Sequence, residues 1–152
     1  MISRSLRLAL AALALPVLLA SCGNVFGPNE DARDLAAAKK AWAAQRVASY
    51  TLVVQPRCYC GQGSLRATVV NGVVTERVIV ETGAPAPPAL FGSIESVDAM
   101  LATLERAVRE HAHEIRATYD THGVPQQAYI DWDANTADEE SGWQVVSLTP
   151  AP

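Results

Sequence analysis

The sequence predicts an α+β domain, a two-layer sandwich in which one antiparallel sheet carries two helices on one face, in the order α-β-β-β-α-β-β-β. Three observations predict it. Two segments repeat apolar residues at helical spacing, and six short segments alternate apolar with polar residues. Turn-forming residues separate consecutive strands. Because each helix has only one apolar stripe, both must pack on the sheet, which leaves its other face to solvent or to a partner.

The first 21 residues are expected to be a leader that is removed. Arg4 and Arg7 precede an apolar run over residues 8–20, which is shorter than the roughly 20 residues that span a bilayer. This pattern is typical of a secretory signal peptide. The run ends in Leu19-Ala20-Ser21-Cys22, which resembles the bacterial lipobox, whose cysteine is lipidated and becomes the new N-terminus. The alternative is a plain signal peptide that happens to contain Cys22.

A lipid on Cys22 would place the protein in the bacterial cell envelope. The protein would be anchored to a membrane without crossing it, since stable anchoring takes more than one acyl chain and lipoproteins of this class carry three. Gly23 stands where an aspartate commonly marks inner-membrane retention, which favours the outer membrane in a Gram-negative cell. The domain would then be periplasmic or extracellular. The sequence does not decide which membrane or which face.

The mature chain is expected to form one domain. Residues 22–29 read as a short tether and residues 30–149 as the domain, which is long enough to bury a core. The whole chain has 12 basic and 16 acidic residues. Removing Arg4 and Arg7 leaves ten basic residues against sixteen acidic ones, a net charge of −6. This balance argues against a nucleic-acid partner.

The first half of the domain reads as a helix and three strands. Leu35, Ala38 and Trp42 share one helical face after residue 30. The strand "SYTLVVQ" alternates, and "SLRATVVNGVVTERVIVE" reads as two strands around Asn71-Gly72. Asn-Gly is the strongest short hairpin signal, because both central residues of a type I′ turn need positive φ. The proline-rich "TGAPAPPALFG" is a connector that cannot continue the sheet.

The second half repeats the element order. Ser96 is a predicted N-cap of a helix whose apolar stripe includes Val97, Leu101 and Leu104. The strands "EIRATYD", "QQAYIDWD" and "WQVVSL" follow, with the polar loop "ANTADEESG" before the last. The matching order suggests a weak duplication of residues 30–81 and 94–149.

Cys58 and Cys60 are the remaining cysteines, and a disulfide between them is the favoured interpretation in an oxidising compartment. In an ideal strand the two Cα atoms would lie nearly 7 Å apart, beyond the usual 4.4–6.8 Å, so the backbone at Tyr59 must kink. Closing so short a loop stabilises a fold by only about 1.6 kcal/mol. A redox-active pair, a metal site and two reduced thiols are the alternatives.

Metal binding has weaker support. A structural zinc site needs four ligands, and no histidine has ligand spacing to the cysteines. The acidic loop between Asp131 and Glu140 partly matches a calcium loop, but Thr136 and Gly142 stand where the pattern needs glycine and glutamate. A solvated hairpin loop is favoured. A calcium site remains open, with these ligands: Asp131, Asp133, Asp138 and Glu139.

Several motifs together resemble a known family. They are Trp42, "SYTLVV" at 49–54, the pair Cys58 and Cys60, "VVNGVV" at 69–74, Ser96-Val97-Asp98, "ATYDTHGVPQQAYIDWD" at 117–133 and "ADEESGW" at 137–143. In this order the chain resembles a bacterial family of secreted and lipid-anchored proteins, designated domain of unknown function 6174, over about residues 30–148. It departs from the family pattern at Met100-Leu101 and at Val124, which keep apolar side chains. The resemblance implies fold and compartment but no activity.

The sequence therefore favours a non-catalytic binding or interaction module without a cofactor. It contains no nucleophile-elbow motif and no phosphate-cradling loop. A partner, if there is one, would be an unidentified envelope protein that binds at the open sheet face and at Tyr59, Trp132 and Trp143. For Trp143, burial in the core is an equally favoured interpretation. Inhibition of an envelope hydrolase is one such role by analogy of fold alone. The alternative function is thiol-redox or metal handling through Cys58 and Cys60. Ligand and oligomeric state are not defined by the sequence.

Overall fold

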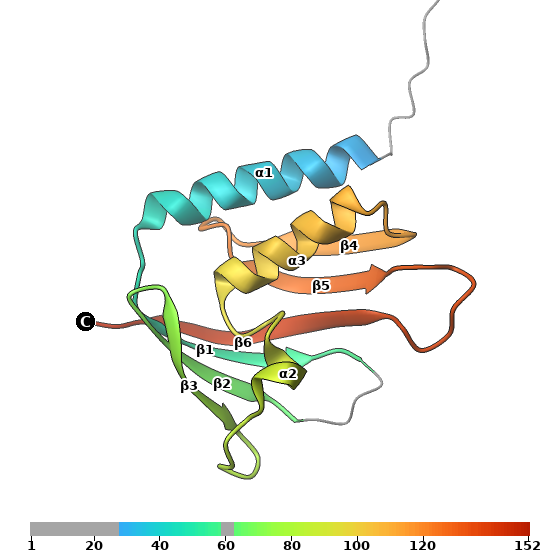
Figure 1. The fold of residues 1–152 in the computed structure, drawn as a ribbon. Helices are drawn as coiled ribbons and strands as arrows, with labels where there is room; N and C mark the ends of the chain where they lie inside the picture. Colours follow the sequence, from blue (N-terminus) through green and yellow to red (C-terminus); the bar gives the residue numbers. More distant parts are fainter. Residues whose placement is uncertain (1–27, 59–62) are drawn as a thin grey trace, which may run out of the picture.

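A computed structural model describes residues 28–58 and 63–152 of the chain (Figure 1). It confirms the predicted class and element order. The short helix α2 within the proline-rich connector is an addition to the predicted elements. In chain order the elements are α1 (Pro28–Gln45), β1 (Tyr50–Pro56), β2 (Leu65–Val70), β3 (Val73–Ile79), α2 (Pro88–Phe91), α3 (Val97–Arg109), β4 (Glu114–Tyr119), β5 (Pro125–Asp131) and β6 (Ser141–Pro150).

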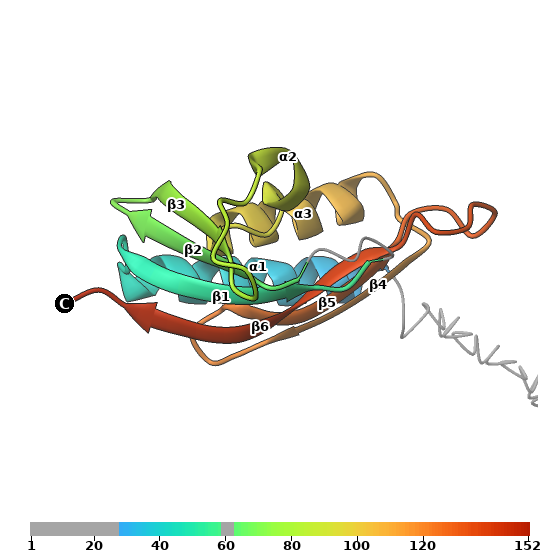
Figure 2. The same cartoon turned by 90° about the horizontal axis from the view of Figure 1, so that it is seen from below.

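The six strands form one antiparallel sheet in the order β3-β2-β1-β6-β5-β4. Each half of the domain contributes three adjacent strands, and the pair β1–β6 joins the halves, with Leu52 opposite Leu148. Helices α1 and α3 pack against each other and lie on the same face of the sheet (Figures 1 and 2). The predicted two-layer arrangement is therefore present.

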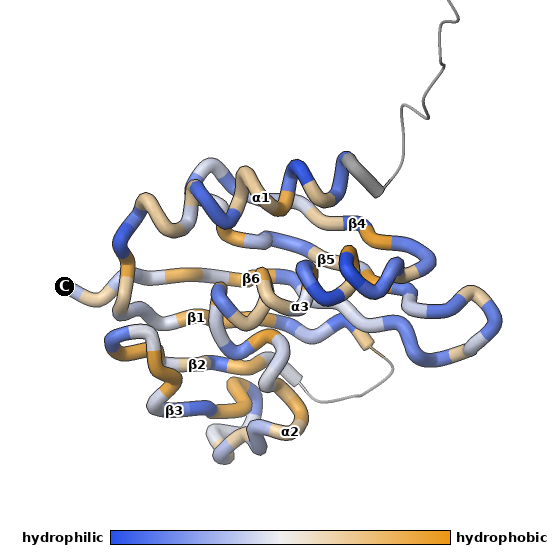
Figure 3. The backbone as a smooth tube through the Cα atoms, turned by 45° about the horizontal axis from the view of Figure 1, so that its top comes forward, coloured by the Kyte–Doolittle hydropathy of each residue, from blue (hydrophilic) through white to orange (hydrophobic). Residues whose placement is uncertain are grey.

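The core lies between the helices and the sheet. Alternation along β1 turns Tyr50, Leu52 and Val54 inward, where each is buried. Burial alternates in the same way along β2, whereas the loop between β5 and β6 is mostly hydrophilic (Figure 3). Each buried leucine or valine side chain contributes about 1.5–3 kcal/mol through removal of apolar surface from water.

The two long helices begin and pack as their sequences dictate. The Ser96 side chain accepts a hydrogen bond from the Ala99 N–H and caps α3, as predicted. Helix α1 begins at Pro28, two residues before the predicted start of the domain. Among the described residues, no helix is both long and apolar enough to cross a bilayer.

A contact between two aromatic side chains links α1 to the sheet. The rings of Trp42 and Tyr50 meet edge to face, with centroids 5.6 Å apart. Trp42 Nε1 donates to Asp98 Oδ1 at 3.2 Å, and the Tyr50 hydroxyl accepts from the Val97 N–H at 3.0 Å. Both bonds end in the first turn of α3, so α1, β1 and α3 hold one another in place.

Two turns depend on glycine. Asn71 and Gly72 have φ values of 50° and 78°, which confirms the predicted hairpin between β2 and β3. Gly123, in the turn between β4 and β5, has a φ of 85°. A Cβ atom there would lie 2.1 Å from the Ala38 carbonyl oxygen and 2.7 Å from the Trp42 nitrogen. This turn therefore rests directly on the backbone of α1.

Candidate functional site

Strands β5 and β6 differ in length, and this difference leaves an open strand edge. β5 pairs with β6 only from Ser141 to Gln144. β6 continues to Pro150, and over this second part it pairs with β1 on its other side. Within the part of the chain that the structure describes, the β5 side of β6 beyond Gln144 therefore has no neighbouring strand.

The hydrogen bonds of β6 show which backbone groups face this open edge. The Ala151 N–H donates to the Ser49 carbonyl oxygen at 2.9 Å, so the backbone groups of Ala151 point toward β1. In an antiparallel pair, such residues alternate along the strand with residues whose groups point away. Thr149 therefore bonds to β1, whereas the N–H and C=O of Leu148 point toward the open edge.

A groove of about 400 Å³ runs along this edge. We call it the β6 groove. Its volume lies within the range of about 300–1,000 Å³ that is usual for ligand sites. The residues that line it are Trp42, Gln45, Val47, Asp120, His122, Val124, Gln126, Val145, Val146, Ser147, Leu148 and Pro150. Four consecutive β6 residues, Val145 to Leu148, contribute to it. Val145 and Leu148 face the helices, whereas Ser147 faces the other side of the sheet, so the groove follows the edge of the sheet.

The walls of the β6 groove combine apolar and polar side chains. Trp42 and Val124 are buried and form an apolar floor, while Val146 is 60% exposed at the rim. Val146 stands out because the pairing of β1 with β6 shifts register between Val53 and Val54, a β-bulge. The bulge thus places an apolar side chain at the rim of an open edge.

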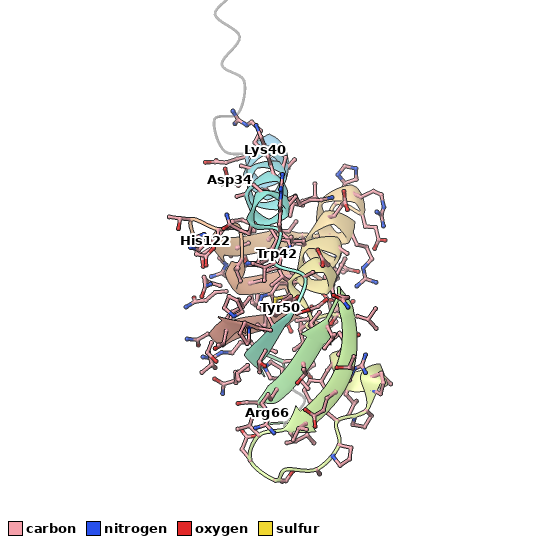
Figure 4. The ribbon with its side chains drawn as sticks, turned by 90° about the vertical axis from the view of Figure 1, so that its left-hand side faces the viewer. Asp34, Lys40, Trp42, Tyr50, Arg66 and His122 are labelled. Carbon is pink, nitrogen blue, oxygen red and sulfur yellow. The ribbon has the colours of Figure 1, made fainter. Side chains whose placement is uncertain are left out.

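The turn between β4 and β5 forms the far wall. One carboxylate oxygen of Asp120 accepts from the N–H groups of His122 and Val124, both at 2.9 Å. The other accepts from the Gln126 side chain at 3.2 Å. Together with the close seat of Gly123 on α1, these bonds fix the wall. Figure 4 shows His122 at this turn and Trp42 on the adjoining helix.

The sheet face opposite the helices is a second exposed surface, and its side chains are mainly polar. Its polar members on the strands include Thr51, Gln55, Arg66, Thr68, Arg116, Thr118, Gln127 and Gln144. Val53, Val78 and Tyr129 face the same side. Gln144 accepts a hydrogen bond from the Arg57 guanidinium, and the Arg116 guanidinium lies 4.5 Å from the centre of the Tyr129 ring. These two contacts hold the Arg57 and Arg116 side chains against the sheet.

Of the three aromatic residues that the sequence offered as partner contacts, the two that the structure describes are not free at an exposed surface. Trp143 is buried and donates from Nε1 to the Pro125 carbonyl oxygen at 3.0 Å, so it belongs to the core. Trp132 is partly buried; its Nε1 donates to Ser141 Oγ at 3.2 Å and the Arg106 guanidinium lies 4.4 Å from its ring centre. Tyr59 lies outside the described residues.

The predicted cysteine sites are not tested by this structure. Cys58 lies just beyond β1, whereas Cys22 and Cys60 lie outside the described residues. Lipidation of Cys22 and the disulfide between Cys58 and Cys60 therefore stay predictions. The same holds for the redox and metal-handling alternatives.

In the acidic loop between β5 and β6, Glu139 and Asp133 accept hydrogen bonds from nearby residues of the same segment. Glu139 Oε1 accepts from the N–H groups of Trp132 and Asp133 at 2.9 and 2.7 Å. Asp133 Oδ1 accepts from the backbone and the side chain of Asn135, and the backbone bond is the main cause that lowers the Asp133 pKa. Over residues 28–58 and 63–152, no three His, Cys, Asp or Glu side chains gather as metal ligands. The candidate calcium ligands are thus not brought together.

Sequence reasoning missed the β6 groove. The sequence feature that could have indicated it is the length of β6, which runs from Ser141 to Pro150 instead of ending near Leu148. A strand longer than its neighbour leaves an edge, but the neighbour can be named only once the strand order is known.

Comparison with known families agrees with the resemblance noted from the sequence. The chain matches the model of a family of unknown function, DUF6174, over residues 34–150, and it belongs to that family. No curated protein matches it. The family assignment covers α1 from Asp34 onward and every strand of the sheet.

Proposed function

We propose that this protein is a lipid-anchored binding module of the bacterial cell envelope, attached through Cys22, and that it binds another envelope protein at the β6 groove. The observation that carries the proposal is the groove itself. It combines an apolar floor, an exposed apolar rim at Val146 and unpaired backbone groups at Leu148. Such a combination of apolar surface and fixed polar groups is typical of binding sites.

The position of the groove supports this role. Helix α1 has 18 residues and is therefore about 27 Å long. The expected tether joins α1 at Pro28, whereas Trp42 and Gln45, near the other end of the helix, line the groove. A domain held by Cys22 would thus present the β6 groove on the side remote from its anchor, where a partner can reach it.

Site-specific photo-crosslinking in living cells tests the binding role. A photoreactive amino acid at Val146 should give a discrete crosslinked protein, because this side chain stands at the groove rim. The matched control is Leu90 on α2, which is 50% exposed but does not line the groove. Equal crosslinking at the two positions, or none at Val146, would overturn the proposal.

The anchor has its own test. Mass spectrometry of the N-terminal peptide should find Cys22 as the first residue and carrying acyl chains. An unmodified N-terminus at another residue would refute the anchored location. A Cys22→Ser variant should appear in the soluble envelope fraction instead of the membrane fraction.

Thiol titration distinguishes the alternative function, redox or metal handling through Cys58 and Cys60, from a structural disulfide. If Cys58 and Cys60 form a structural disulfide, the denatured mature protein should react with a thiol reagent only after reduction. Free thiols or bound metal in the native protein would favour redox or metal handling instead.

A further inference from the structure

We propose that the β6 groove binds its partner as an extended peptide segment, which adds to the sheet as a strand beside β6. This inference rests on the proposed binding function and names the form of the ligand. Its first basis is the open edge of β6, since an unpaired strand edge is a template for another strand.

The backbone groups at the edge match a peptide backbone. The N–H and C=O of Leu148 point into the groove, and by the same alternation the C=O of Pro150 does so too. Proline has no N–H, so the edge offers a donor at Leu148 with acceptors on Leu148 and Pro150. An extended chain carries donors and acceptors at this same repeat, and it can satisfy them in one register.

The side-chain surroundings set the character of the segment. Successive residues of a strand point to opposite faces. On the helix side, an added strand would meet the apolar surfaces of Trp42, Val47 and Val124, which favour an aliphatic side chain. On the opposite side it would pass Val146, at the rim. We therefore expect an extended segment with at least one aliphatic residue directed toward Trp42.

A second copy of this domain does not fit. Neighbouring strands lie about 4.8 Å apart, and any strand of another copy would bring its own paired strand along. That further strand would have to occupy the place of the turn at Asp120 and His122, which forms the far wall. The groove thus has room for one unaccompanied strand.

The tether of the same chain does not reach the groove either. Residues 22–27 span at most about 20 Å when fully extended. They start from the Pro28 end of α1, and the groove lies near the other end of this helix of about 27 Å. In a chain processed at Cys22, as proposed above, the segment must therefore come from another protein.

Peptide selection on the full-length mature protein in detergent micelles tests the inference. Phage-displayed random ten-residue peptides would be selected on the protein, and one enriched peptide synthesised as the probe. In the free protein, the amide hydrogen of Leu148 should exchange faster than that of Thr149, which bonds to β1. The bound peptide should slow exchange at Leu148 at least tenfold and leave Thr149 nearly unchanged.

Variants locate the binding. Val146→Arg, which puts a long charged side chain at the rim, should weaken peptide binding at least tenfold, whereas the matched Leu90→Arg should not change it. Leu148→Pro removes the N–H that faces the groove without removing a bond to β1, and should also weaken binding. If that variant does not fold, exchange at Leu148 in the unmodified protein still decides.

The outcomes distinguish this inference from the proposed function. If no peptide is enriched, or if bound peptides leave Leu148 exchange unchanged, strand addition is wrong. Crosslinking at Val146 in cells would then still support a binding role through another mode. Loss of that crosslinking as well would overturn the proposed function itself.

Discussion

Replacement of Gly123 by alanine tests the contact between α1 and the turn that walls the groove. The new Cβ would lie 2.1 Å from the Ala38 carbonyl oxygen and 2.7 Å from the Trp42 nitrogen, which are backbone atoms of a helix and cannot rotate away. Gly123 also has a φ of 85°, a conformation that alanine rarely adopts. The substitution must therefore move either the turn or the helix.

The expected loss of stability in Gly123→Ala is the sum of a conformational cost and a packing cost. A side chain in the left-handed region costs roughly 1–2 kcal/mol. Forcing an extra carbon into a packed contact costs about 1–3 kcal/mol more. The expected loss in the free energy of unfolding for Gly123→Ala is thus about 2–5 kcal/mol, a large part of the total stability of an ordinary domain.

Gly72→Ala provides a matched control. Gly72 has a φ of 78°, and a Cβ there would have no atom within 4 Å, so only the conformational cost applies. Urea denaturation of the two variants and the parent, followed by circular dichroism, gives the three free energies. Gly123→Ala should be less stable than Gly72→Ala by about 1–3 kcal/mol. Equal losses in the two variants would refute the close contact between this turn and α1.

Three further predictions concern the turn wall, an ion pair and a tyrosine. Asp120→Ala should lower the free energy of unfolding by about 1–3 kcal/mol and reduce crosslinking from Val146. Asp133→Ala removes a similar set of hydrogen bonds from the β5–β6 loop and should leave this crosslinking intact. Glu95→Ala should lower the free energy of unfolding by roughly 1.5–3 kcal/mol in urea denaturation, since its hydrogen-bonded ion pair with Arg77 is partly buried. Glu105→Ala breaks an exposed ion pair with Lys39 and should lower the free energy of unfolding much less than Glu95→Ala does. Equal losses in the two variants would contradict this reasoning. Burial, with Asp34 and Asp31 nearby, raises the pKa of Tyr119 from 10.0 to about 12. The unfolded chain thus loses this proton first, so stability should fall as pH rises from about 10 toward 12. In Tyr119→Phe that fall should be shallower, and an unchanged slope would contradict the assignment.

Local signals in the sequence predicted the elements well. Asn71-Gly72 predicted the hairpin because few residue pairs tolerate two positive φ values, and Ser96 predicted the start of α3 because its hydroxyl can cap a helix. Trp42 was placed on the buried face of α1 by helical spacing alone. In each case the physical cause lies within a few residues of the feature, so a sequence can show it.

Features that depend on distant residues were not predictable. Nothing near Leu148 indicates that β6 pairs with β1, or that β5 ends its pairing at Gln144. The β6 groove arises from these two facts together. Likewise, the sequence left both burial and exposure open for Trp143, because the Pro125 carbonyl oxygen that accepts its indole N–H is 18 residues away in the chain. The short α2 was missed because prolines argue against strands without specifying what replaces them.

The place of β6 in the sheet has a consequence for how the protein matures. β6 is synthesised after the other five strands of this sheet, yet it lies in the middle, between β1 and β5. Until it arrives, both of those strands have an uncovered edge, and uncovered edges promote aggregation. The sheet therefore closes only after β6 has been made and, in an exported protein, has crossed the membrane. Truncation after the β5–β6 loop should accordingly give an aggregating fragment, not a smaller stable domain.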